Sequence, residues 1–262
     1  IQTAISAASF DFILTTDADC VLPENWLGCY DQELNMNNSK LVAGPVGFIQ
    51  HKKQKKPLFQ NFEELDFLSL QATTVGAFGI GKAFLCNGAN LCYEKEAFVQ
   101  HSECTYQEIA SGDDVFLLQQ FQKKGLPVSF LKTRDALVRS RFQPDLKSLI
   151  NQRIRWAAKT TSYPSFFSKY TAIIVFMMNL SLIIYGFLAL FSLFPYQYFM
   201  LFFLLKFNLD AAMIYRAAKF ANREAVMRNY FWSSVIYPFF SVSIALLSLF
   251  KGYEWKGRKF KK

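Results

Sequence analysis

The sequence predicts an α/β domain followed by an α-helical transmembrane region, and three observations carry this prediction. Near the N-terminus a short apolar run leads into an acidic turn, which is typical of a strand with a ligand site at its carboxyl end. From Tyr170 to Leu205, 36 consecutive residues contain no charge and no histidine. Basic residues gather in that same half: residues 151–262 hold 15 Lys and Arg against 3 Asp and Glu, whereas residues 1–150 hold 14 against 17.

The composition excludes several classes of protein. Hydrophobic residues make up 52% of the 262 residues and aromatic residues 17%, which excludes a disordered chain. A basic excess confined to the more hydrophobic half indicates a membrane rather than nucleic acid. The five cysteines include no C-x-x-C pair, which argues against a disulfide framework and for a reducing compartment. Neither histidine has the spacing of a zinc site.

The first elements follow from apolar runs and the turns between them. Residues 1–10 resemble the end of a helix, and a chain that opens inside a helix predicts that earlier strands are missing. Residues 12–16 form an apolar run suited to a buried strand, which is closed by the turn Asp-Ala-Asp-Cys at residues 17–20. Residues 41–49 predict a further strand.

A helix is expected over residues 58–75, where apolar positions recur at helical spacing. Glu63, Glu64 and Asp66 fall on the other side of this helix, away from its apolar stripe. Two interpretations remain open, because such a helix either packs on its own domain as a surface helix or lies against a membrane interface.

The next stretch predicts short elements in quick succession. Residues 76–81 predict a loop, residues 84–86 a strand and residues 96–100 the start of a helix. Residues 114–124 have helical spacing, which stops at a Gly-Leu-Pro sequence, and residues 128–131 predict another strand.

The uncharged stretch is too long for one membrane span. As a single helix its 36 residues would extend about 54 Å, against a hydrocarbon core of about 30 Å. We therefore expect a hairpin at residues 194–196, between spans at residues 171–193 and 197–215. Lys206 and Asp210 lie four residues apart, and a charged pair within a span usually faces protein or water rather than lipid.

A third uncharged run, residues 229–250, is long enough to span but contains Pro238. Both the segment 216–228 and the tail 252–262 are rich in Lys and Arg, which favours the cytoplasmic side for both. A complete third crossing by residues 229–250 would place the tail on the opposite side of the membrane from segment 216–228. We therefore expect Pro238 to break the run into a re-entrant or interfacial hairpin, with a cytoplasmic C-terminus. The expected division is an α/β domain over residues 1–165, a transmembrane region over 166–251 and a basic tail.

Two acidic motifs bear chemistry. Asp17 and Asp19, just past a buried strand, can hold a hard divalent cation that neutralises a diphosphate, although a solvated acidic turn is the alternative. Asp113 and Asp114 open a helix, where they either interact with its dipole or supply a general base that takes a proton from a hydroxyl.

A third motif, Gln152-Arg153-Ile154-Arg155-Trp156, lies directly before the membrane region. A guanidinium offers fork-like donors to phosphate oxygens, and an indole offers a flat stacking face. A basic stop before a membrane span would explain the arginines, but it would not explain Gln152 or Trp156.

Together these motifs resemble those of the membrane-bound family-two glycosyltransferases, which include cellulose, chitin and hyaluronan synthases and ceramide glucosyltransferases. The resemblance rests on D-x-D, an acidic pair about 95 residues later, Q-x-x-R-W about 38 residues further, and transmembrane helices directly after it. The segment Asn87-Gly88-Ala89-Asn90 is similar to the family's segment that lines the acceptor side. The resemblance covers nearly the whole chain.

The resemblance implies a Rossmann-like GT-A fold, here without its N-terminal strands, and an inverting transfer from a nucleotide-diphosphate sugar with Mg²⁺ or Mn²⁺. A UDP-sugar is the expected donor. It also implies the following roles: Asp19 and Asp17 for the metal and the donor diphosphate, Asp114 with Asp113 beside it for the catalytic base, Gln152, Arg155 and Trp156 for the diphosphate and the acceptor end, and Asn87, Gly88 and Asn90 for the acceptor side. The acidic pair reads Gly-Asp-Asp rather than the Thr-Glu-Asp of cellulose synthases.

The expected reaction adds a sugar to a lipid or glycan hydroxyl at the cytoplasmic face of the inner membrane. The protein would be multi-pass and contact membrane lipids but no nucleic acid. A processive polysaccharide synthase is an alternative, although three spans make only a small channel, which favours single transfer. The alternative of another class is a non-catalytic membrane subunit or transporter element, supported only by Lys206 and Asp210.

Overall fold

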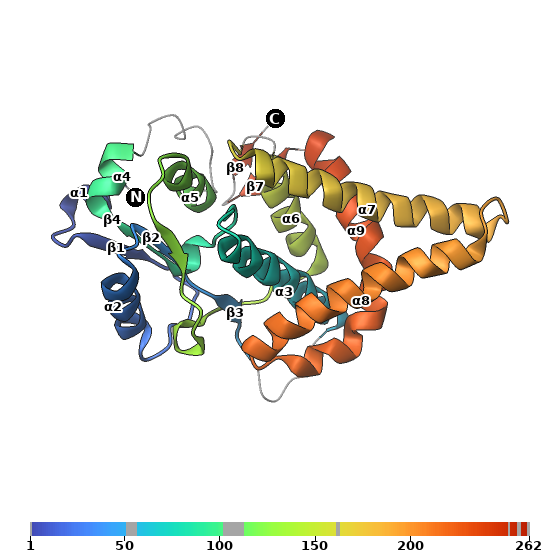
Figure 1. Ribbon diagram of the computed structural model, residues 1–262, viewed down its shortest axis with the longest axis horizontal. Helices are drawn as coiled ribbons and strands as arrows, with labels where there is room; N and C mark the ends of the chain where they lie inside the picture. The colour runs from blue at the N-terminus through green and yellow to red at the C-terminus, as the bar shows by residue number, and fades with distance from the viewer. Residues whose placement is uncertain are drawn as a thin grey trace. The chain divides into compact units, whose positions relative to one another are not determined.

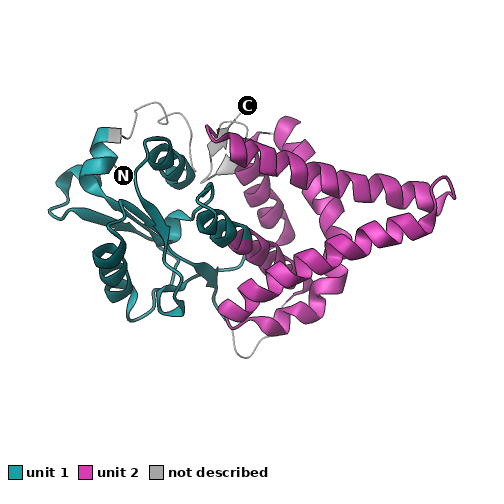
Figure 2. Cartoon of the chain, in the orientation of Figure 1, with its two compact units in different colours: residues 1–53, 73–142 teal, residues 54–72, 143–262 magenta. Residues whose placement is uncertain are grey.

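The computed structural model describes residues 2–50, 57–101, 113–160, 163–250, 252–255 and 258–260. The chain divides into two compact units, residues 1–53 with 73–142 and residues 54–72 with 143–262, which are coloured separately in Figure 2. The second unit thus combines residues 54–72 and 143–165 with the apolar segments that follow, and the expected boundary at residue 165 stays a prediction. Within the basic tail, residues 256–257 and 261–262 lie outside the described residues.

The first unit is built on a mixed four-stranded sheet. Its spatial order is β1-β4-β2-β5, and the strands are β1 (Phe12–Thr15), β2 (Leu41–Ala43), β4 (Leu91–Glu94) and β5 (Val128–Phe130). The central strand β4 is antiparallel to both neighbours, and its Cys92 lies opposite Leu14 of β1 and Val42 of β2. β2 and β5 run parallel. A smaller parallel sheet pairs β3 (Val46–Phe48) with β6 (Val138–Ser140).

Helices cover both faces of the larger sheet (Figure 1). Successive residues of a strand point to opposite faces, so Leu91 and Tyr93 pack with α5 (Asp113–Lys123), whereas Cys92 packs with α2 (Trp26–Asn37). The shorter helices of this unit are α1 (Gln2–Ala7), η1 (Gly88–Asn90), α4 (Lys95–His101) and η3 (Arg134–Ala136). This layered α/β arrangement is the predicted one.

The run at residues 41–49 forms two strands rather than the single strand predicted. The chain changes sheets at Gly44 and Pro45, where the Gly44 N–H donates to the Asn90 carbonyl at 2.8 Å. A Cβ on Gly44 would lie 2.3 Å from the Asn90 amide nitrogen and 2.6 Å from the Tyr30 hydroxyl, so only glycine fits there. This close approach ends β2 and redirects the chain into β3.

The strand predicted at residues 84–86 is wrong. These residues belong to no strand, and the Phe84 carbonyl accepts a hydrogen bond of 3.1 Å from the Gln119 side chain of α5 instead of a ladder bond. The central position in the sheet is taken by β4, whose residues bury their side chains on both faces of the sheet.

The long helix α3 (Leu58–Gly79) continues through most of the predicted loop at residues 76–81. It ends where Gly81 adopts a left-handed conformation with φ +66°, as glycine commonly does past a helix C-terminus. Its carboxylates are not solvent-exposed: Glu63 is 1%, Glu64 2% and Asp66 7% exposed. The prediction that they lie on the side away from the packed stripe is therefore wrong.

The second unit packs helices around the first half of α3. These helices are α6 (Leu146–Thr160), α7 (Phe166–Leu190), α8 (Tyr196–Phe220), η4 (Glu224–Asn229) and α9 (Tyr230–Phe250), and a hairpin of β7 (Tyr253–Trp255) and β8 (Arg258–Phe260) follows. Leu65 and Leu68 of α3 share an apolar cluster with Ile214 of α8 and Tyr230 of α9. The Phe62 ring meets that of Phe240 edge-on at 4.9 Å.

Each of the three α3 carboxylates binds a different segment of this unit. Glu63 accepts from the Gln143 backbone N–H at 3.1 Å, and Glu64 pairs with Arg223 through both oxygens. Asp66 accepts from Arg153 Nε at 2.6 Å. Because a buried charge is costly unless it is paired, these partners explain how an enclosed helix carries three carboxylates. Burial still raises the pKa of Glu63 above its ordinary value.

In the part of the chain that the structure describes, three helical segments are long and apolar enough to cross a membrane: α7, α8 and Glu224–Phe250. A short turn joins α7 to α8 (Figure 1), and Pro195 caps the start of α8, which places the hairpin where it was predicted. Apolar side chains such as Ile173 of α7 and Leu201 of α8 are more than half exposed. These exposed surfaces indicate a membrane protein.

The charged pair of α8 and the proline of α9 have different outcomes. Lys206 and Asp210 form an ion pair within α8, and whether this pair faces protein or water stays a prediction. By contrast, α9 is continuous through Pro238, so the predicted break into a hairpin does not occur. Pro238 is buried in a helix that packs against α6 and α7. Such neighbours allow a membrane helix to keep a proline that would break an isolated one.

Candidate active site

The acidic turn follows β1 directly in the first unit. Asp17 and Asp19 are exposed and Cys20 is half-buried, and one ligand atom from each lies within 4.8 Å of the others. The Cys20 N–H donates to the Asp17 carbonyl at 3.1 Å, which closes the turn. Val21 then exchanges two backbone hydrogen bonds with Arg139 of β6, at 2.8 and 3.0 Å. The turn is therefore held by β1 before it and by the pairing of Val21 with β6 after it. It presents two carboxylates at the end of a strand.

This set of donors fits a hard divalent cation. Carboxylate oxygens are the ligands that Mg²⁺ and Mn²⁺ prefer. Burial raises the pKa of the Cys20 thiol, and the neighbouring Asp17 and Asp19 raise it further, so the thiol is neutral near pH 7. The two carboxylates are thus the residues suited to hold the ion.

The second acidic motif is connected to β1 through Gly88. Asp114 lies at the start of α5, where its Oδ2 accepts from the Gly88 N–H at 2.7 Å and its Oδ1 from the Val115 N–H at 2.9 Å. The carbonyl of the same Gly88 accepts from Thr15 Oγ1 at 2.7 Å. Thr15 is the last residue of β1 and stands just before Asp17. A single glycine therefore links the carboxylate of Asp114 to the strand that carries the acidic turn.

The two acidic residues of α5 differ in their surroundings. Asp113 is exposed, whereas Asp114 is half-buried and oriented by two backbone N–H groups. Both occupy the first turn of the helix, as predicted, and the Gly112 that precedes them lies outside the described residues. A carboxylate that is already oriented is the better candidate for a general base.

The three residues expected on the acceptor side have different roles in the fold. Gly88 makes the contacts described above, and Asn87 caps η1 by accepting from the Ala89 N–H at 3.0 Å. Asn90 has no exposed surface. An acceptor-side role stays a prediction for Asn87 and Gly88, whereas the side chain of Asn90 serves the interior of the first unit.

The Asn90 amide uses its full hydrogen-bonding capacity within the protein. Its oxygen accepts from Trp26 Nε1 and from the Tyr30 hydroxyl, both at 2.8 Å. Its nitrogen donates to the carbonyls of Pro45 at 2.7 Å and Ala136 at 2.8 Å. One side chain thus joins α2, the β2–β3 connection and η3.

Asn90→Ala is expected to lower the free energy of unfolding by about 2–3 kcal/mol, because it leaves buried donors and acceptors unpaired. Thermal unfolding of the full-length protein in detergent measures the loss. Asn87→Ala is the matched control, since it removes one hydrogen bond at a half-buried cap and should cost only about 0.5–1 kcal/mol. Equal losses for the two variants would contradict the role assigned to Asn90.

The third motif lies on α6, in the second unit. Gln152, Arg155 and Trp156 are half-buried, whereas Arg153 is 6% exposed. Arg153 donates to Asp66 and to the Gln152 side-chain oxygen, and its guanidinium carbon lies 4.3 Å from the centroid of the Trp156 ring. The motif is therefore organised around Arg153, which the sequence alone explains as part of a basic stop before a membrane span. The sequence did contain a signal for this role of Arg153. If the helix that carries Glu63, Glu64 and Asp66 is buried, its carboxylates need basic partners from elsewhere in the chain.

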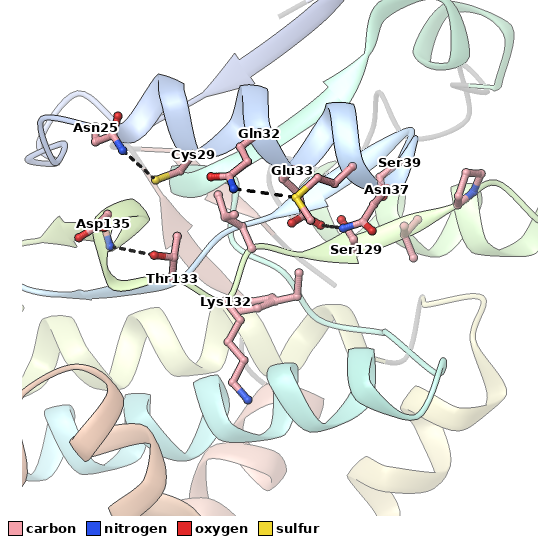
Figure 3. Close-up of a pocket in the computed structure, with 15 residues that line it drawn as sticks. Asn25, Cys29, Gln32, Glu33, Asn37, Ser39, Ser129, Lys132, Thr133 and Asp135 are labelled. Atoms are coloured by element: carbon pink, nitrogen blue, oxygen red, sulfur yellow. Dashed lines mark hydrogen bonds between the residues drawn. The ribbon is translucent and has the colours of Figure 1, made fainter.

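The first unit also contains a cavity of about 720 Å³ between α2 and the β5 region (Figure 3). Its lining is mostly polar and includes Gln32, Glu33, Ser129 and Lys132, and its internal contacts include a 2.7 Å hydrogen bond from Asn37 to Glu33. None of the candidate site residues lines this cavity. It is therefore separate from the chemistry of the motifs.

The described cysteines are unsuited to act as nucleophiles. Burial raises the pKa of each thiol above its ordinary value, most clearly for Cys86 and for Cys92, whose pKa is about 12. All four are free: Cys20, Cys29, Cys86 and Cys92. Since the thiolate is the reactive form, these four thiols are poor candidates for a nucleophile.

Comparison with known proteins adds one match. The model of a family described as "Glycosyl transferase family group 2" matches residues 12–215 of the 262. The match begins at β1 and ends within α8, so it includes every candidate site residue. No curated protein matches the chain.

Proposed function

The chain belongs to glycosyl transferase family group 2, and from this premise we propose that it is an inverting, metal-dependent glycosyltransferase that moves a sugar from a UDP-sugar to a hydroxyl of a lipid or glycan. Membership of the family implies a GT-A fold, a nucleotide-sugar donor and an acceptor. The observation that supports the finer proposal is the link through Gly88, which ties Asp114 to the strand before Asp17 and Asp19.

The proposed reaction is a single displacement at the anomeric carbon. The acceptor hydroxyl oxygen forms a bond to this carbon as the bond to the diphosphate oxygen breaks, and the hydroxyl proton passes to Asp114. Asp17 and Asp19 would hold Mg²⁺ or Mn²⁺, which supplies positive charge to the donor diphosphate. Arg155 stabilises the departing diphosphate, and Gln152 and Trp156 hold the diphosphate and the acceptor end.

Single transfer remains preferred to processive synthesis, because three apolar segments leave little room for a polymer channel. The alternative of a transporter element rested on Lys206 and Asp210. These two residues pair with each other within one helix, a contact that stabilises α8 without any transport function.

The function is tested by donor turnover of the full-length protein in detergent. We expect release of UDP from at least one UDP-sugar in the presence of a lipid or glycan acceptor, loss of this release in EDTA, and recovery on addition of Mn²⁺ or Mg²⁺. A panel of nucleotide sugars and membrane lipid extracts covers the unknown donor and acceptor. Absence of metal-dependent turnover across the panel would contradict the proposal.

The proposal places the first unit on the cytoplasmic face of the inner membrane, where nucleotide sugars are available. Leu193 in the α7–α8 turn then lies outside the cell, and Ala225 in η4 lies inside. Leu193→Cys should react with a membrane-impermeant thiol reagent in intact cells, whereas Ala225→Cys should react only after lysis. The parent protein is the blank, because its five cysteines all lie in the half expected inside. The opposite labelling pattern would reverse the topology.

A further inference from the structure

We propose that Arg153 is a positioning residue that orients Gln152 and Trp156, and that Asp66 of α3 holds Arg153 in place. This inference deepens the proposed function and rests on it, because Gln152 and Trp156 were assigned there to the donor diphosphate and the acceptor end. Arg153 itself is not assigned a contact with substrate.

The contacts of one guanidinium carry the proposal. Its Nε donates to Asp66 Oδ2 at 2.6 Å, one terminal nitrogen donates to the Gln152 side-chain oxygen, and its central carbon lies 4.3 Å from the centroid of the Trp156 ring. A guanidinium is rigid and planar, so fixing one edge fixes the direction of the others. The bond to Asp66 therefore sets where the amide of Gln152 and the indole of Trp156 lie relative to each other.

Stability alone does not account for this pair. The side chains of Arg153 and Asp66 are each 6% exposed, and burying two charges costs free energy that a close contact only partly recovers. A second terminal nitrogen of Arg153 is buried without a hydrogen-bond partner among the described residues, which adds to the cost. Apolar residues of similar size would fill the same space more cheaply. The arrangement is therefore better explained by the two motif side chains that it holds.

The same helix offers a matched comparison. Glu64 of α3 pairs with Arg223, with exposed side-chain fractions of 3% and 18%, and uses both carboxylate oxygens. Neither residue has a hydrogen bond or ring contact with Gln152 or Trp156 among those observed in the described residues. This second pair shares the helix, the charge types and the low exposure, but it lacks the connection to the motif.

The experiment replaces each pair by apolar residues in the full-length protein. The double variant Asp66→Leu/Arg153→Met should keep its melting temperature, because buried ion pairs often tolerate apolar replacement. Its kcat/KM should fall about 10- to 100-fold, as expected when catalytic side chains are misplaced. The control Glu64→Leu/Arg223→Met should keep the wild-type kcat/KM. Loss of activity in both double variants, or in neither, would overturn the proposal.

A mutant cycle separates positioning from a general structural effect. In a Gln152→Ala/Trp156→Phe background, replacing Asp66 and Arg153 should have almost no further effect on kcat/KM, since the side chains they orient are gone. Additive losses would mean that Arg153 acts by another route. If the apolar pair lowers the melting temperature, Arg153→Lys is the alternative variant, because it keeps a charge beside Asp66 but loses the planar fork.

Fluorescence gives a readout that does not depend on turnover. The fluorescence of Trp156 is obtained for the wild-type protein and for each double variant. It is the difference between the emission spectrum of that protein and the spectrum of the same protein with Trp156→Phe added. Replacing Asp66 and Arg153 should shift this difference spectrum, whereas replacing Glu64 and Arg223 should leave it unchanged. A wild-type protein without metal-dependent turnover would refute the proposed function, whereas an unchanged Trp156 spectrum would refute the positioning role.

Discussion

Asp114→Asn is expected to lower kcat by about 10²- to 10⁴-fold while the donor binds nearly as tightly, because an amide cannot accept the proton of the acceptor hydroxyl. The amide oxygen can replace one carboxylate oxygen as acceptor, either for Gly88 or for Val115. The amide nitrogen cannot accept the other N–H, so the side chain also loses part of its fixed orientation. Single-turnover kinetics together with donor titration separates the two quantities.

The neighbouring residue supplies the control for this prediction. Asp113 shares the first turn of α5 but is exposed, so Asp113→Asn should reduce kcat far less. A more severe loss in Asp113→Asn would move the base to that residue. If Asp114→Asn weakened donor binding as much as turnover, Asp114 would be a structural residue rather than the base.

Asp19→Asn is expected to reduce turnover by about 10²-fold or more, because it removes charge from the site that would hold the cation beside the diphosphate. The concentration of Mn²⁺ needed for half-maximal activity should rise, which a defect in acceptor binding would not produce. Asp17→Asn should also be severe. Measurement of turnover over a series of Mn²⁺ concentrations checks both expectations.

Asp11 is a matched control at the opposite end of the same strand. It is exposed and directly precedes β1, whereas Asp17 and Asp19 follow it. Asp11→Asn removes the same charge from the same sheet edge and should leave the Mn²⁺ requirement unchanged. Near-normal turnover of Asp19→Asn, or an equal effect of Asp11→Asn, would show that the acidic turn holds no catalytic ion.

Sequence patterns that extend over a few residues predicted the helices, strands and turns whose formation depends on neighbouring residues in the chain. β1, α5 and the hairpin before Pro195 lie close to their expected positions, because an apolar run, a helical spacing and a proline each act over a few residues. β2 and β3 could not be separated in this way. Their division depends on Gly44 passing against Asn90 and Tyr30, which are distant in the sequence.

The same reasoning explains which site residues were assigned incompletely. Asn90 matched a motif, but its four partners come from three separate segments, so its burial could not be read locally. The α3 carboxylates were expected in water because charged residues usually are, and their partners Arg153 and Arg223 follow much later in the chain. Arg153 was overlooked because basic residues before a membrane span need no other explanation.

The ion pairs of α3 also set an order for biogenesis. Asp66 precedes its partner Arg153 by 87 residues, and Glu64 precedes Arg223 by 159. At a synthesis rate of about 5–20 residues per second, Glu64 waits roughly 8–30 seconds for its partner. During that interval the ribosome completes the described strands and helices of the first unit that follow α3, while the first half of α3 still carries unpaired carboxylates. We therefore expect this segment to stay hydrated until α6 and η4 have emerged, so that the second unit closes late in translation.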